Sequence, residues 1–203
     1  HLILHHIGPI LIALSNPLPV MRFWFEKISP GWRRTLRPLG WFYQVLQQPF
    51  IALFLFVGLI YFWLWPSIHF DAMLSRDLYW VMNWSMLLDG LLFWWLIFDP
   101  RPPAITSSLG YGRRMLVLAA AGVLQMFLGA WIVFSRDMVY DVYEVCGRAW
   151  PLDPEVDQLL GGMLTYIPPA MMSILGILLM LRRAMHQDGK YANQSKPLEE
   201  TAS

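Results

Sequence analysis

The chain has 203 residues, of which 57% are hydrophobic and 14% are charged, and its net charge is +1. The charged fraction is well below the roughly 25% that is usual in soluble domains, so the composition excludes an ordinary soluble protein and indicates a membrane protein. The single cysteine, Cys146, excludes an intramolecular disulfide and a cysteine-based zinc site.

Five apolar segments follow one another along the chain, at residues 1–14, 49–66, 78–98, 115–134 and 159–181. A helical span needs about 20 apolar residues, so the first is too short to cross a membrane alone. We therefore expect an all-α integral membrane protein, a helical bundle of about five transmembrane helices in this chain and more in the full-length protein. Residues 1–185 would form the membrane domain, and the polar residues 186–203 a disordered tail.

The first segment, HLILHHIGP, carries three histidines. On a helix His1 and His5 share a face, close enough for both imidazoles to reach one ion, whereas His6 would serve a neighbouring helix. Each histidine could equally be a hydrogen-bonded packing residue.

Residues 17–48 mix aromatic and basic side chains with Pro and Gly. This pattern favours an interfacial segment whose cations face anionic lipid, and we expect no nucleic-acid partner.

Asp89 falls near the middle of the third span, where an unpaired carboxylate costs several kcal/mol. Gln125 is the one strong polar side chain at similar depth in the fourth span. Asp89 is therefore either a helix-locking hydrogen-bonded group or part of a proton or ion relay.

The fifth span begins DPEVDQLLGGMLTYIPPAMM. Gly161 and Gly162 favour close helix contact, and Pro168 with Pro169 predicts a kink or irregular turn at membrane depth. Met163 is a candidate soft ligand for Cu(I) or a packing residue, and Asp157 could orient a histidine or cap the helix.

The basic residues concentrate on alternate connections. Twelve of them lie between the first and second spans, between the third and fourth spans, and after the fifth span. The other connections hold three basic residues, Arg76, Arg136 and Arg148, and eight acidic residues. The positive-inside rule then makes the basic loops and the carboxyl tail cytoplasmic, and puts the histidines and the acidic loop 135–158 near the outer face.

No phosphate-binding loop, nucleophile elbow or zinc-protease motif is present, so we expect no enzymatic activity.

Four stretches, HLILHHIGP, GLLFWW (90–95), GAWIVFS (129–135) and DQLLGGMLTYIP (157–168), resemble the CtaG-type, multi-span cytochrome c oxidase assembly factor family. In that family a further histidine usually stands four residues before the position of His1, which implies a preceding segment with one or two more spans. Many relatives have a histidine where this chain has Asn83. A metal role at that position is therefore not expected here.

The resemblance implies a role in maturing haem–copper oxidases in the bacterial inner membrane, with copper as the expected cargo and haem as an alternative cargo that the sequence leaves open. Its partners would be an oxidase subunit and a periplasmic copper chaperone, and the copper would be Cu(I). The expected ligands are His1, His5, His6 and Met163, with Asp157, Tyr166, Asp89 and Gln125 in support and Cys146 on the same side. Two alternatives remain open, a copper transporter using Asp89, Gln125 and the Pro168–Pro169 break, and a metal-free scaffold.

Overall fold

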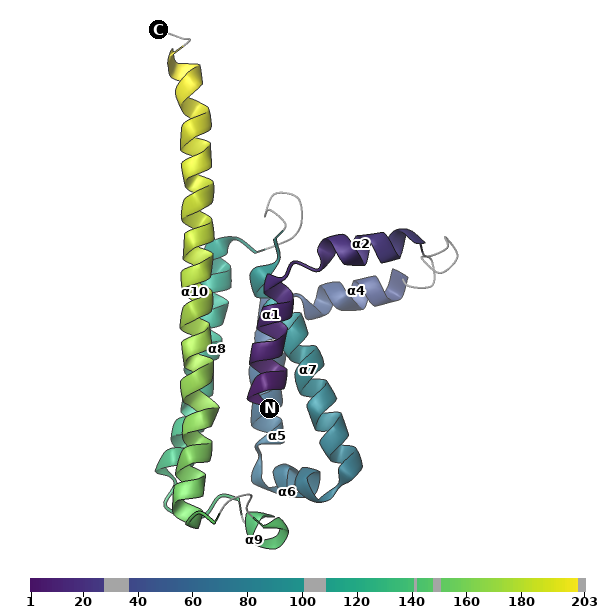
Figure 1. Cartoon of the computed structure of the whole chain (residues 1–203), viewed down its shortest axis with the longest axis vertical. Coiled ribbons are helices and arrows are strands. Elements are labelled where there is room, and N and C mark those ends of the chain that lie inside the picture. The colour runs from purple at the N-terminus through teal and green to yellow at the C-terminus, as the bar shows by residue number, and fades with distance from the viewer. Residues whose placement is uncertain (28–36, 101–108, 141, 148–150, 201–203) are drawn as a thin grey trace.

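The computed structural model describes the backbone of residues 1–27, 37–100, 109–140, 142–147 and 151–200; for some of these, including Cys146 and 188–200, it describes the backbone alone. The regular elements in these ranges are all helices (Figure 1). They are η1 (Ile3–Ile7), α1 (Gly8–Leu14), α2 (Leu18–Lys27), α4 (Arg37–Leu46), α5 (Pro49–Trp63), α6 (Pro66–Leu74), α7 (Arg76–Phe98), α8 (Tyr111–Phe134), α9 (Val142–Cys146) and α10 (Pro154–Glu200).

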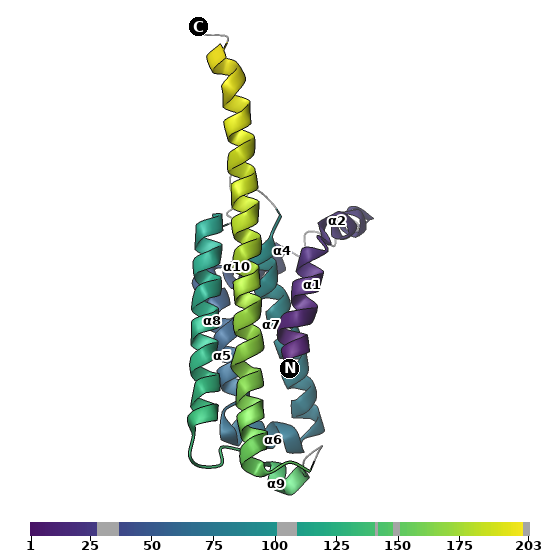
Figure 2. The same ribbon diagram turned by 60° about the vertical axis from the view of Figure 1, so that its left-hand side comes forward.

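The long helices form an open arc. Helix α10 packs on α8, α8 on α5, α5 on α7, and η1 with α1 on α7. Helices α6 and α9 lie at one end of this bundle, while α2 and α4 project sideways at the other end (Figures 1 and 2). The opening helix therefore stands at one end of the arc and α10 stands at the other.

Among the described residues, three helices are long and apolar enough to cross a membrane, namely α7, α8 and α10 up to Gln187. A fourth span is possible only if Gly40–Leu46 and Pro49–Trp63, bent by 74°, count as one broken span. The expected number of about five is thus not confirmed. Helix α5 has 15 residues, about 22 Å at the helical rise, whereas the hydrocarbon core is about 30 Å thick.

The opening helix is irregular because of Pro9. This proline has no N–H to donate to the carbonyl of His5, and the Gly8 N–H bonds instead to the Ile3 carbonyl, which makes Ile3–Ile7 a π-helical turn. The His5 carbonyl then lies directly against Gly90 of α7, where a Cβ atom would overlap it. The close approach of η1 to α7 depends on this glycine.

Helices α8 and α10 meet along a seam of small residues, which we call the glycine seam: Gly122 and Gly129 on α8, and Gly162 and Gly176 on α10. A Cβ atom on Gly129 would lie 2.5 Å from Cβ of Tyr166, and one on Gly162 would lie 2.7 Å from the Val133 side chain. The prediction of close contact therefore applies to Gly162. At Gly161 a Cβ atom would meet open space.

Helix α10 runs without interruption through Pro168 and Pro169. The predicted irregular turn is not found, whereas the alternative, a kink within a continuous helix, stays a prediction. The packing of α10 against α8 supports the helix where its own backbone hydrogen bonds are lost. The helix also continues to Glu200 and projects beyond the bundle (Figure 1). The division of the chain into a membrane domain and a disordered tail stays a prediction.

The end of α7 nearest α2 and α4 is capped by two arginines. Arg114 is buried and donates to the carbonyls of Leu109, Ile97 and Asp99 at 2.8, 3.1 and 2.7 Å. Arg183 of α10 donates to the Phe98 carbonyl at 3.2 Å. Cations are favourable at a helix C-terminus, where the last carbonyls have no partner within the helix.

Candidate functional site

Two buried polar pairs join the opening helix to the middle of the bundle. The first is His5 with Asp89, whose Nε2 and Oδ2 atoms are 3.2 Å apart. The His5 ring stacks on Phe56 at 4.2 Å, and Phe56 stacks in turn on Phe93 at 3.8 Å. The imidazole is therefore fixed by both its hydrogen bond and its stacking partner.

The second pair is His6 with Gln125, whose Nε2 and Oε1 atoms are 3.3 Å apart. Both residues are almost completely buried, and the rings of His5 and His6 lie 4.9 Å apart, edge to face. Since Asp89 and Gln125 fall near the middle of their helices, these two histidines lie deeper in the bundle than the outer position that the sequence suggested.

The partners determine which ring nitrogen of each histidine carries the proton. The amide oxygen of Gln125 can only accept a hydrogen bond, so Nε2 is the donor in His6; in His5, Nε2 is the donor when Asp89 is ionised, because a carboxylate can only accept. In a neutral imidazole the Nδ1 atom then keeps a lone pair. Within the described part of the chain, the buried Nδ1 atoms of His5 and His6 have no hydrogen-bond partner, and neither has Nε2 of Gln125.

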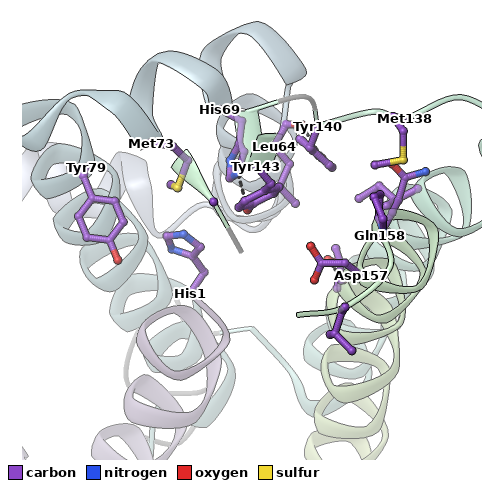
Figure 3. Close-up of a pocket in the computed structure, with 16 residues that line it drawn as sticks. His1, Leu64, His69, Met73, Tyr79, Met138, Tyr140, Tyr143, Asp157 and Gln158 are labelled. Atoms are coloured by element: carbon purple, nitrogen blue, oxygen red, sulfur yellow. Dashed lines mark hydrogen bonds between the residues drawn. The ribbon is translucent and has the colours of Figure 1, made fainter. Parts of the chain in front are cut away.

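Two adjoining cavities lie between these histidines and the α6–α9 end of the bundle. The inner pocket, of about 320 Å³, is lined by four histidines, two methionines and residues of α10; its lining includes His1, His5, His6, His69, Met82, Met86, Gly161, Thr165 and Pro169. The outer pocket, of about 470 Å³, lies between α6 and the start of α10 (Figure 3). Its lining includes His1, His69, Met73, Tyr79, Met138, Tyr143, Asp157 and Gln158. His1, Leu64, His69, Gly161 and Thr165 border both pockets.

His69 is the site residue that reading the sequence missed. It lies on α6, is buried, and donates from Nδ1 to the Trp63 carbonyl at 3.2 Å, while its Nε2 is 3.1 Å from the Tyr143 hydroxyl. Burial lowers the pKa of His69, although the bond to Trp63 opposes this, so the ring is neutral at neutral pH and its Nε2 accepts from Tyr143. The sequence did contain one indication of its role: His69 stands four residues before Met73, in a connection between spans that is predicted to lie on the outer side.

The other expected site residues are dispersed. His1 is exposed and lies 6.4 Å from the Tyr79 ring, and Asp157 borders the outer pocket. Met163 borders neither pocket, and Tyr166 packs against Gly129 in the glycine seam. The side chain of Cys146 lies outside the described residues.

The described residues contain no group of three or more His, Cys, Asp or Glu side chains positioned to hold a metal ion. What the site offers is imidazole nitrogen and methionine sulfur at low coordination number, a donor set that suits Cu(I).

Replacing Asp89 tests how the first pair holds the bundle together. Asp89→Leu leaves the buried Nε2–H of His5 without an acceptor, and we expect it to lower the free energy of unfolding by about 1–3 kcal/mol. Asp89→Asn keeps an acceptor oxygen and should retain most of the stability. Thermal unfolding in detergent measures both, and equal melting temperatures for Asp89→Leu and the unchanged chain would contradict the pairing.

The chain matches a known protein family over most of its length. A sequence profile described as "Cytochrome c oxidase caa3 assembly factor (Caa3_CtaG)" matches residues 1–187. Neither the curated proteins nor the solved structures include a significant match.

Proposed function

Because the chain belongs to the cytochrome c oxidase caa3 assembly factor family, we propose that it holds Cu(I) at His5 and His6 for delivery to the catalytic subunit of the oxidase. The observation that carries this proposal is the pair of buried histidines, each anchored through Nε2 and each with an unpartnered Nδ1 atom. A histidine that binds metal typically donates its other N–H to a carboxylate or carbonyl oxygen, as both do here.

Charge balance supports a monovalent ion at this position. An isolated carboxylate at membrane depth is costly, and Asp89 has a neutral histidine rather than an arginine or lysine beside it. A Cu(I) ion on the far nitrogen of the same imidazole would make the site neutral overall. A divalent ion would leave an excess positive charge.

Methionine sulfur is available to complete the coordination. Met82 and Met86 stand one turn apart on α7, are buried, and border the inner pocket with His5 and His6. Met163, the methionine ligand expected from the sequence, borders neither pocket. The proposed site uses the sulfur atoms that border the cavity, and it involves no turnover chemistry.

The direction of delivery follows from charge. Acidic residues gather at the α6–α9 end, among them Asp71, Asp77, Asp137 and Asp157, whereas Lys27, Arg113 and Arg183 lie at or near the opposite end. By the positive-inside rule the outer pocket opens to the periplasm of a bacterial inner membrane. Copper would then arrive from a periplasmic chaperone and leave on the side where the oxidase receives it.

Copper retention by the purified full chain tests the proposal. We expect a Cu(I) held at His5 and His6 that is lost in the paired variant His5→Phe with Asp89→Leu, because removing both partners avoids a buried unsatisfied group. His6→Leu with Gln125→Leu should also lose it. His186→Ala, a histidine exposed on α10 far from the pockets, is the matched control and should keep the ion.

The same variants separate the competing functions. Loss of copper should be accompanied by loss of oxidase activity in cells that depend on this chain for assembly. If the wild-type protein binds no copper, or if the paired variants support full oxidase assembly, the copper-holding function is wrong and the metal-free scaffold is the remaining function. Asp89-dependent copper flux into proteoliposomes would indicate the transporter instead.

A further inference from the structure

The outer pocket contains a second set of soft ligands that the proposed site does not use. His69 and Met73 are four residues apart on α6, so they share one face of that helix, and both border the outer pocket. Figure 3 shows the His69 imidazole, the Met73 thioether and the His1 imidazole on the same wall of this pocket. Across the pocket lie Asp157 and Gln158.

The hydrogen bonds of His69 present one particular atom to a ligand. Nδ1 is held by the carbonyl of Trp63, at the C-terminal end of α5, where helix carbonyls need a side-chain donor. Nε2 therefore carries the lone pair, and it accepts from the hydroxyl of Tyr143 at 3.1 Å. Tyr143 belongs to α9, a helix of five residues.

We propose that His69 Nε2 and Met73 Sδ form a second Cu(I) site at the mouth of the inner pocket, and that Tyr143 is its displaceable cap. Copper binding breaks the hydrogen bond from the Tyr143 hydroxyl and forms an N–Cu bond in its place. No proton is released from the imidazole, because Nε2 is already unprotonated. The Tyr143 hydroxyl turns to water in the pocket.

The two sites border adjoining pockets. His1, Leu64 and His69 border both pockets, so an ion bound at the mouth site is at the opening of the cavity that ends at His5 and His6. This inference rests on the proposed function for the choice of Cu(I) and for the destination of the ion. The mouth site itself depends only on residues of α6 and α9.

Titration of the full chain in detergent with Cu(I), in competition with a chromogenic Cu(I) chelator, tests the mouth site. We expect two ions per chain in the wild type and one in Met73→Leu, a volume-conserving change that leaves the His69–Trp63 bond in place. Met185→Leu, at an exposed methionine on α10, is the matched control and should keep two. Tyr143→Phe removes the competing hydroxyl, and the mouth site should bind about fivefold more tightly, the value of one hydrogen bond.

The outcomes for the two sites are distinguishable. One ion, lost with the His5 and His6 pairs but unaffected by Met73→Leu and His69→Ala, would overturn the mouth site and leave the proposed function standing. One ion lost only with Met73→Leu or His69→Ala would overturn the proposed function and keep the mouth site. X-ray absorption should detect a Cu–S contribution that decreases in Met73→Leu, and an unchanged sulfur signal would also count against Met73.

Discussion

Replacing Gly90 by alanine is expected to release the opening helix from α7 and to abolish copper retention and oxidase assembly together. The added methyl group would overlap the carbonyl oxygen of His5 and lie 3.0 Å from Cγ of Pro9. Backbone atoms cannot turn aside as the end of a flexible side chain can, so η1 must move away. The His5–Asp89 hydrogen bond, already 3.2 Å long, is then lost.

The expected cost is that of overpacking, about 1–3 kcal/mol, with the lost buried hydrogen bond added to it. Gly58→Ala is the matched control, because a Cβ atom at this position of α5 meets nothing within 4 Å. Alanine is the better helix former, so Gly58→Ala should melt at or above the wild-type temperature. If Gly90→Ala melts like Gly58→Ala and retains copper, the close approach of His5 to α7 is wrong.

Replacing Arg114 by alanine is expected to be the most destabilising single change at the opposite end of the bundle. It removes a buried cation and leaves the carbonyls of Leu109, Ile97 and Asp99 without that donor. Hydrogen bonds from charged donors contribute about 1.5–3 kcal/mol each and are not additive, so a loss of at least about 3 kcal/mol is expected. Protein yield and melting temperature should fall together.

Two comparisons make the Arg114 result specific. Arg113→Ala removes the same charge from an exposed neighbour and should change stability by less than about 0.5 kcal/mol. Arg114→Lys keeps the charge but not the planar fork that reaches three carbonyls, and should fall between the two. Equal stability of Arg114→Ala and Arg113→Ala would show that the carbonyls are satisfied by other donors.

Hydropathy predicted where the helices lie because burial in lipid requires long apolar runs, and each of the five predicted segments contains a helix. The number of spans was less predictable. Helix α5 ends at Trp63 because a turn before Pro66 starts α6, and only its bend against α4 allows it to be counted as part of a span. Hydropathy measures apolar length and does not detect such a bend.

The polar partners were partly predictable. Asp89 and Gln125 were identified because polar side chains at membrane depth need partners, but the expected contact was with each other or with their own helices. The structure pairs them with His5 and His6 instead. Regular α-helical spacing suggested that His1 and His5 act as one unit. Both border the inner pocket, but His1 is exposed whereas His5 is buried.

His69 escaped prediction because its importance depends on tertiary contacts. A lone histidine in a nine-residue helix has no periodic pattern to mark it, and its two partners, Trp63 and Tyr143, come from elements on either side in the chain. Only the folded chain brings α5, α6 and α9 to one place.

The glycine seam and the inner pocket involve different faces of the bundle. The seam holds α8 and α10 against each other as a helical hairpin, whereas the inner pocket lies between α10 and the helices that carry the histidines. The close contacts of this seam involve no residue of the opening helix. That helix instead approaches α7 at Gly90 and brings His5 and His6 to the inner pocket, so the wall of this pocket is complete only when the opening helix is in place.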